Sequence, residues 1–468
     1  MQLVIRIFLS AAVAALLGIT GASAQSARAS LSGTWTGALM GTLDLTLHLT
    51  DPATGPRTAT LDIPAQHAKD LPLLFTAPAD SVYLRLTQPP ARFVGHRSAD
   101  GQQLVGEWQQ GLQAFPLTLS RGDGTARPAG PRRPQTPQPP FPYQATDIIF
   151  KNGQAGVTLA GTYTVPADKG PFPAVVLLTG SGPEDRNETI LGHQPFAVLA
   201  DYLSRHGVAV LRFDDRGVGQ SGGTLAGTTS ADYTTDAQAA LAWLRAQPGI
   251  SKNHVGLLGH SQGGTAAIGA AGLPDGPNFL VLLATPGTPG DELIVQQLLA
   301  LGKMSGIAPV QLSAIEKTQR QVLAVVQQTP DLTQARAKLL PLLNTSLTTD
   351  PAALTQVDSQ INQLLSPNYR HLLADRPAQT LAKVHCPVLA LGGSKDLQVP
   401  ATANLAAIAA ALKANGNRDV TTKELPGLNH LFQTATTGSP AEYGVITETF
   451  APFALPLIGD WIVQHAKK

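Results

Sequence analysis

The sequence predicts an open, doubly wound α/β domain that contains a helical insertion and follows a small all-β domain. Short continuous apolar runs at residues 174–178 and 208–213 each lead into a turn rich in glycine or aspartate, which is typical of strands buried on both faces of a parallel sheet. Stretches with helical periodicity, such as residues 196–206, lie between these runs. Strict alternation of apolar and polar residues is instead concentrated before residue 121 and indicates half-buried antiparallel strands.

Residues 1–24 have the pattern of an export signal. Arg6 provides a positive charge, residues 7–18 form a short apolar run, and Ala-Ser-Ala at residues 22–24 is a small-residue cleavage motif. We therefore expect cleavage before Gln25 and a periplasmic or extracellular protein. The apolar run is too short to cross a bilayer comfortably, and no later stretch is long and uninterrupted enough, so no stable membrane span is expected.

The composition favours a globular protein of several domains. The chain has 468 residues, of which 43% are hydrophobic and 14% charged, and its formal net charge is +1. Such a chain can bury a large core, and its length suggests two or three domains. A nucleic-acid-binding surface needs a basic stripe, and the sequence has no long run of one charge, so no nucleic-acid partner is expected. Cys386, the single cysteine, is expected to be a small buried residue.

The predicted all-β domain covers residues 30–121. Residues 43–50 and 82–87 alternate apolar and polar side chains, and turn residues separate the alternating segments. A small sandwich or an open barrel fits this pattern. Trp35 and Trp108 are predicted to be core or rim aromatics rather than sugar-binding platforms.

A proline-rich linker and then the α/β domain follow. Residues 122–145 contain many prolines, which favour an extended, semi-rigid segment. The β/α alternation covers residues 146–288 and 377–468, whereas residues 289–376 show helical periodicity only. A compact sheet needs no connection of that length, so we expect an inserted helical lid. The same helices could instead mediate a dimer, and the oligomeric state stays open.

The strongest motif is Gly-His-Ser-Gln-Gly at residues 259–263. It follows a predicted strand and precedes a predicted helix, which is the strand–turn–helix context of a nucleophile elbow. The flanking glycines allow a sharp turn, and the helix N-terminus favours negative charge that develops near the serine. Ser261 is therefore the predicted nucleophile.

A serine nucleophile needs a base and an orienting acid. His430 lies in a Pro-Gly-Leu-Asn turn beyond a late predicted strand, where its imidazole can face a cleft. Asp396 directly follows the predicted strand at residues 388–391, and is preferred over Glu424, which lies in or near a strand. The order Ser, Asp, His is that of α/β-hydrolases.

The oxyanion of an acyl-transfer reaction needs backbone N–H donors. The N–H of Gln262 is one predicted donor, and the N–H of Ser181, with Gly182 as the next choice, is the other. Asp215 and Arg216 are interpreted as structural, and His260 as a packing and hydrogen-bonding residue. The sequence has no histidine and carboxylate cluster with metal-ligand spacing, so neither a metal nor a cofactor is predicted.

From residue 146 to the C-terminus the chain resembles exported bacterial α/β-hydrolases of the esterase D-like carboxylesterase group, which are related to serine aminopeptidase-type hydrolases. The resemblance rests on residues 173–183, 212–219, 259–264 and 395–400. The all-β domain and the linker also resemble that group. The resemblance implies carboxylesterase activity on short acyl chains, with Ser261, Asp396 and His430 as the triad.

A small-molecule ester, cleaved through an acyl-enzyme, is therefore the expected substrate. One alternative is a serine peptidase that trims N-terminal residues, which would need an acidic subsite for the substrate's ammonium group. Scattered acidic residues of the predicted lid, such as Glu316 and Asp331, do not decide between the two. A second alternative is a surface-binding protein with a secondary hydrolase domain, which a complete triad argues against.

Overall fold

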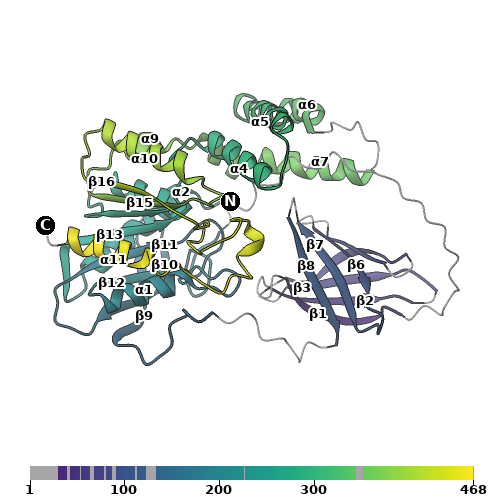
Figure 1. Cartoon of the computed structure of the whole chain (residues 1–468), viewed down its shortest axis with the longest axis horizontal. Coiled ribbons are helices and arrows are strands. Elements are labelled where there is room, and N and C mark those ends of the chain that lie inside the picture. The colour runs from purple at the N-terminus through teal and green to yellow at the C-terminus, as the bar shows by residue number, and fades with distance from the viewer. Residues whose placement is uncertain are drawn as a thin grey trace. The chain divides into compact units, whose positions relative to one another are not determined.

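The protein consists of two compact units, an all-β barrel and an α/β unit, shown in the computed structural model of Figure 1. The structure describes residues 30–39, 43–52, 54–63, 68–78, 81–86, 91–110, 113–122, 133–225, 227–343 and 351–466. The predicted export signal at residues 1–24 lies outside the described residues, as does the part of the predicted linker at residues 123–132.

Eight antiparallel strands form a closed barrel in sequence order. The strands are β1 (Gly33–Leu39), β2 (Leu43–Thr50), β3 (Thr58–Ile63), β4 (Ala68–Thr76), β5 (Ser81–Leu86), β6 (Ala91–Arg97), β7 (Gln103–Gln110) and β8 (Gln113–Arg121). The prediction of a sandwich or an open barrel is wrong, because Trp35 and Thr36 of β1 pair with Arg121 and Ser120 of β8. This pairing satisfies backbone groups that would otherwise form two sheet edges.

The barrel core is built from alternating residues of its strands. Leu45, Leu47 and Leu49 of β2 are all buried, whereas the polar residues between them are partly exposed. Trp35 and Trp108 are 0% and 5% exposed, which confirms that they are core aromatics.

The α/β unit is built on an eight-stranded sheet with the order β16-β15-β14-β13-β11-β12-β10-β9. Its strands are β9 (Tyr143–Asn152), β10 (Val157–Pro166), β11 (Phe172–Leu178), β12 (Ala209–Phe213), β13 (Ile250–His260), β14 (Leu280–Leu283), β15 (Val388–Gly393) and β16 (Val420–Leu425). β9 and β10 are antiparallel to each other, and β10 is antiparallel to β12. The strands β11 to β16 all run parallel to one another. The order reverses around β11, which lies between β12 and β13, and ligands of such sheets bind beyond the strand ends at this point.

The sheet begins earlier than the sequence pattern predicts. β9 starts at Tyr143, inside the predicted linker of residues 122–145, because Tyr143 pairs with Pro166 at the far end of β10. Ten consecutive residue pairs join these two strands, so the hairpin extends to the last proline of the linker.

Helices cover both faces of the sheet (Figure 1). They are α1 (Pro195–Arg205), α2 (Ser230–Arg245), α3 (Gln262–Ala271), α10 (Ala401–Ala414) and α11 (Ala454–His465). Val176 of β11 packs into the core shared with α2, α3 and α10, whereas its neighbours Val175 and Leu177 pack into the core shared with α1 and α11. The continuous apolar runs are therefore strands with both faces buried, as predicted.

In the described residues between β14 and β15, the secondary structure is helical. It contains α4 (Gly290–Met304), α5 (Pro309–Gln328), α6 (Leu332–Leu343), α7 (Pro351–Leu364), α8 (Pro367–Ala374) and the short α9 (Pro377–Leu381). Leu312, Val322 and Val326 form part of the buried face of α5, in agreement with their helical spacing. Among the described residues, no helix combines the length and apolarity needed to cross a bilayer.

Candidate active site

Ser261 lies at a sharp turn between β13 and α3. Its backbone has φ 53° and ψ −118°, a conformation that side chains of L-residues rarely adopt. The Ser261 N–H donates to the carbonyl oxygen of Leu283, 2.8 Å away in the adjacent strand β14. The residue is 1% exposed, so a strained serine is held at the carboxyl end of the central strands.

Two glycines make this turn possible. A Cβ atom on Gly259 would lie 2.3 Å from the carbonyl carbon of Gly263. A Cβ atom on Gly263 would lie 2.2 Å from the carbonyl oxygen of Leu178, at the end of β11. No side chain fits at either position, and the start of α3 therefore packs directly on the strand end that leads into the loop at residues 179–182.

His430 and Asp396 meet beyond the ends of β15 and β16. The Nδ1 atom of His430 lies 2.8 Å from Oδ2 of Asp396, and both side chains are almost completely buried. The other carboxylate oxygen of Asp396 accepts the backbone N–H groups of Gln398 and Val399, each at 2.8 Å. The carboxylate is thus held by three donors, and it orients the imidazole so that Nε2 is the nitrogen available to a reacting group.

The loop that carries His430 lies beside the turn that carries Ser261. The imidazole of His260, directly before the serine, lies 4.8 Å from that of His430 between ring centroids. The Nε2 atom of His260 also lies 2.9 Å from the backbone carbonyl oxygen of His430. Hence the three predicted triad residues belong to adjoining loops at the carboxyl ends of the parallel strands.

Glu424, the alternative candidate for the orienting acid of the triad, lies elsewhere in the fold. It is exposed on β16, and its carboxylate accepts the hydroxyl of Thr402 at 2.6 Å. The preference for Asp396 over Glu424 agrees with this geometry.

The loop after β11 borders the serine. A Cβ atom on Gly180 would lie 3.7 Å from Cβ of Ser261, so the backbone of this loop passes directly over the elbow. Ser181, the next residue, is half-buried. Gln262 is the first residue of α3, where a backbone N–H has no acceptor within the helix. The two predicted oxyanion donors thus lie on the two segments that adjoin Ser261.

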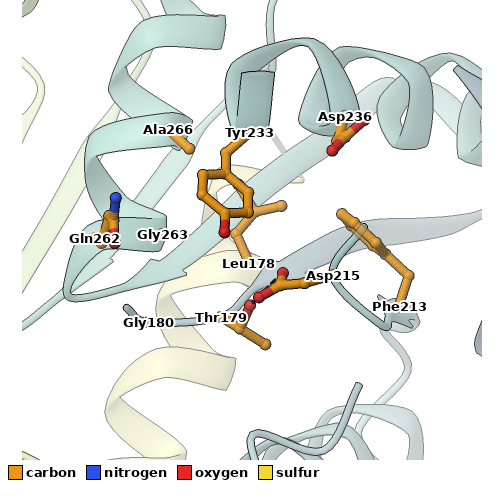
Figure 2. A pocket seen from close by; sticks show the side chains of 10 residues that line it. All are labelled: Leu178, Thr179, Gly180, Phe213, Asp215, Tyr233, Asp236, Gln262, Gly263 and Ala266. Atoms are coloured by element: carbon orange, nitrogen blue, oxygen red, sulfur yellow. Dashed lines mark hydrogen bonds between the residues drawn. The ribbon is translucent and has the colours of Figure 1, made fainter. Parts of the chain in front are cut away.

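A small pocket lies next to these segments (Figure 2). It is lined by Leu178, Thr179, Gly180, Phe213, Asp215, Tyr233, Asp236, Gln262, Gly263 and Ala266. Figure 2 shows the side chains of Asp215 and Thr179 in contact, and the Thr179 hydroxyl donates to Asp215 at 2.9 Å. Burial raises the pKa of Asp215 to about 7, although this hydrogen bond and one from the N–H of Glu184 oppose the shift.

The charged turn after β12 is held by ion pairs. Arg216 contacts Asp232 and Asp236 of α2 at 2.9 and 2.8 Å, and Asp214 contacts Arg186 at 2.7 Å. These contacts fasten the turn to neighbouring elements, which agrees with a structural role for Arg216.

Sequence reasoning missed Glu188. Its carboxylate is buried, lies 2.7 Å from Nδ1 of His260 and accepts the N–H of Gly180 at 2.8 Å. Burial lowers the pKa of His260, but the charge and hydrogen bond of Glu188, the hydrogen bond to the carbonyl of His430 and the charge of Asp396 together raise the pKa to about 9. A histidine at the end of a buried strand needs a polar partner, and this is the one sequence signal that points to a buried acid such as Glu188.

Cys386 differs slightly from its prediction. It is partly rather than fully buried, and burial raises the pKa of its thiol to about 12. Within the described part of the chain, no three histidine, cysteine, aspartate or glutamate side chains gather in a way that could hold a metal ion.

The strand order and the nucleophile elbow define an α/β-hydrolase. The family model described as X-Pro dipeptidyl-peptidase (S15 family) matches residues 155–426, which is more than half of the chain. The chain therefore belongs to this family.

A curated relative is Esterase EstD of Thermotoga maritima, which is 35% identical over 166 residues. The match covers 35% of this chain and 39% of the esterase, so the chain spans well under half the length of that relative. Among solved structures, an esterase of Pyrococcus furiosus is 16% identical over 69% of this chain and 93% of its own, with a TM-score of 0.41. A proline iminopeptidase of Mycobacterium smegmatis is 17% identical over 68% of this chain and 98% of its own, with a TM-score of 0.42.

Proposed function

We propose that this protein is a serine hydrolase that cleaves carboxylic esters with short acyl groups. The observation that carries the proposal is the buried hydrogen bond between His430 and Asp396, 2.8 Å long, on loops that adjoin the strained Ser261. A base held in one tautomer beside a strained serine is the arrangement that acyl transfer requires. The similarity to Esterase EstD supports an ester as the substrate.

The proposed reaction has two halves. Ser261 Oγ forms a bond to the ester carbonyl carbon while His430 Nε2 takes the serine proton, and the carbonyl oxygen becomes an oxyanion. We assign the oxyanion to the N–H groups of Gln262 and Ser181. The carbon–oxygen bond to the alcohol then breaks, and the alcohol leaves with the proton from His430. A water molecule, deprotonated by His430, attacks the acyl carbon. The bond from that carbon to Ser261 Oγ then breaks, Ser261 regains a proton from His430, and the acid is released.

We also propose that the helical insertion is a lid. Gln297 of α4 is 3% exposed, and its side-chain amide donates to the backbone carbonyl of Gln398 at 2.6 Å. The N–H of Gln398 in turn donates to Asp396. The insertion is thus joined to the loop of the proposed acid, which supports a covering role over the site rather than the alternative role in a dimer.

Export is a further part of the proposal. The support is the charged, apolar and small-residue pattern of residues 1–24. N-terminal sequencing of the mature protein should begin at Gln25. Recovery of the uncleaved chain from a periplasmic or culture fraction would contradict this cleavage.

A second candidate function is N-terminal trimming of peptides. It is considered because the family is described as X-Pro dipeptidyl-peptidases, whereas the similarity to Esterase EstD supports the ester. The two candidates share Ser261 and differ in whether the substrate carries an ammonium group near the scissile bond.

The test is a comparison of substrates and serine variants. We expect turnover of p-nitrophenyl acetate, with kcat/KM at least tenfold above that for an aminoacyl-anilide, and loss of about 10⁴-fold or more in Ser261→Ala. Ser204→Ala is the matched control, because Ser204 is also buried, at 2% exposed, and its hydroxyl bonds to Thr164 away from the site. Full ester turnover by Ser261→Ala would overturn the proposed function, and a preference for the anilide would favour the peptidase.

A further inference from the structure

The imidazole of His260 bridges two loops of the candidate site. Its Nδ1 atom lies 2.7 Å from Oε1 of Glu188, and its Nε2 atom lies 2.9 Å from the backbone carbonyl oxygen of His430. The same Oε1 atom of Glu188 accepts the N–H of Gly180 at 2.8 Å. A continuous chain of hydrogen bonds thus links the loop after β11 to the loop of the proposed base.

The two hydrogen bonds of His260 indicate the charge of its imidazole. Both ring nitrogens of His260 face oxygen atoms, a carboxylate oxygen on one side and a backbone carbonyl oxygen on the other. A carbonyl oxygen can only accept, and a neutral imidazole has a single N–H. Glu188 Oε1 already accepts the N–H of Gly180 and so acts as an acceptor in this set of hydrogen bonds. The imidazolium is therefore the form of His260 that donates to both of its neighbours.

We propose that His260 is a positioning residue that acts as an imidazolium at neutral pH: paired with Glu188, it fixes the backbone of His430 and the loop at Gly180 relative to Ser261. The inference rests on the proposed hydrolase function, and it assigns Glu188 and His260 a task in that reaction. Neither residue needs to touch the substrate. Together they set the distance between the base, the nucleophile and the oxyanion loop.

The charges around His260 keep it protonated. Glu188 faces it from the loop after β11, Asp396 from the loop after β15 and the ring of His430 from the loop after β16. Glu184 is the further acid near this cluster, and burial with the charge of Glu188 raises its pKa to about 8. Burial lowers the pKa of His260, and Glu188 and Asp396 offset this to give about 9.

Loss of the positive charge of His260 should weaken the positioning of the His430 loop without blocking substrate binding. A neutral His260 that keeps its bond to Glu188 turns a lone pair toward the carbonyl oxygen of His430, and the two acceptors repel each other. The His430 loop then loses its anchor, so kcat should fall while KM changes little. In the wild-type protein this should give an alkaline limb in the profile of kcat against pH near a pH of about 9.

Glu188→Gln tests the charge with little change in shape. The glutamine oxygen can still accept the N–H of Gly180, but the variant removes the negative charge that keeps His260 protonated. We expect the alkaline limb to move down by about two pH units and kcat at pH 8 to fall by about tenfold or more, with KM within about twofold.

The matched control is Asp62→Asn in the barrel. Asp62 also combines a histidine contact, 3.0 Å to His48, with a backbone N–H from Asp70 at 2.7 Å. The control should keep the wild-type pH profile of kcat. An unshifted alkaline limb in Glu188→Gln would overturn the proposal, because a purely structural loss lowers kcat at every pH without moving the limb.

A second readout does not depend on turnover. ¹⁵N resonances of histidine-labelled protein, assigned with His260→Gln, should show both nitrogens of His260 protonated at pH 8 in the wild type and one nitrogen deprotonated in Glu188→Gln. A neutral His260 in the wild type at pH 8 would overturn the proposal. If the imidazolium is present and the wild type cleaves no ester, the charged pair stands and the proposed function fails.

Discussion

At the scale of single residues, the surroundings of Asp396 define its role most narrowly. Its carboxylate accepts from His430, Gln398 and Val399, and its side chain is completely buried. Such an acid can hold the imidazole in one tautomer and stabilise the positive charge that it gains during acyl transfer.

Asp396→Asn should lower kcat for p-nitrophenyl acetate by about 10⁴-fold and leave the fold intact. The asparagine retains the shape of the carboxyl group, but it can turn an N–H₂ group toward Nδ1 and favour the wrong tautomer of His430. Asp419→Asn is the control, because it alters another aspartate–histidine pair, 3.2 Å to His465, at a distant position. Activity within tenfold of the wild type in Asp396→Asn would contradict the role of this acid.

Some residues of the candidate site could be predicted from the sequence and one could not. Ser261, Asp396 and His430 could be predicted because each follows a recognisable strand and the order of the three is restricted in this fold. Glu188 was missed because it is 72 residues from His260 in sequence, in a loop without a motif. Its task depends on a contact that exists only after folding.

At the scale of elements, the turn at Ser261 joins β13 to α3, and it fits because Gly259 and Gly263 have no side chains. The carbonyl oxygens of Leu178 and Thr179 lie 2.2 and 2.4 Å from the place of a Cβ atom on Gly263. Both are backbone atoms of the segment leading into the predicted oxyanion loop, so they cannot move without shifting that loop.

Gly263→Ala should therefore destabilise the protein by about 2 kcal/mol or more and reduce ester turnover at least tenfold. Gly153→Ala is the control, since a Cβ atom there meets no atom within 4 Å and the backbone has no positive φ. Urea unfolding and kcat/KM measure the two effects. Wild-type stability in Gly263→Ala would contradict the packing described for the elbow.

The barrel shows the limit of sequence patterns for elements. Period two predicted its strands, but an open barrel, a sandwich and a closed barrel share that period. Closure depends on the pairing of Trp35 with Arg121, residues at opposite ends of the unit, and no local pattern records such a contact. The α/β sheet was more predictable because runs buried on both faces have few other solutions.

At the scale of the whole molecule, the segment before β9 is part of the α/β unit. The guanidinium of Arg133 donates to the carbonyl oxygens of Leu191, Gly444 and Ile446 at 2.6 to 2.7 Å. The side-chain oxygen of Gln135 accepts the N–H groups of Thr449 and Phe450. These residues, within the predicted linker, hold together loops that precede α1 and α11.

A chain that begins at residue 133 should keep ester turnover and thermal stability close to those of the mature protein. A chain that begins at residue 143 loses the contacts of Arg133 and Gln135, and its Tm should fall by about 5 °C or more. Equal Tm values for the two truncated chains would contradict the anchoring role of this segment.

The central claim is that Ser261 is the nucleophile, and covalent labelling tests it most directly. The mature protein is incubated with a fluorophosphonate, digested and analysed by peptide mass spectrometry. A single adduct on Ser261, absent after His430→Ala, is the predicted result. An adduct on another serine, or none while the untreated protein hydrolyses p-nitrophenyl acetate, would contradict the claim.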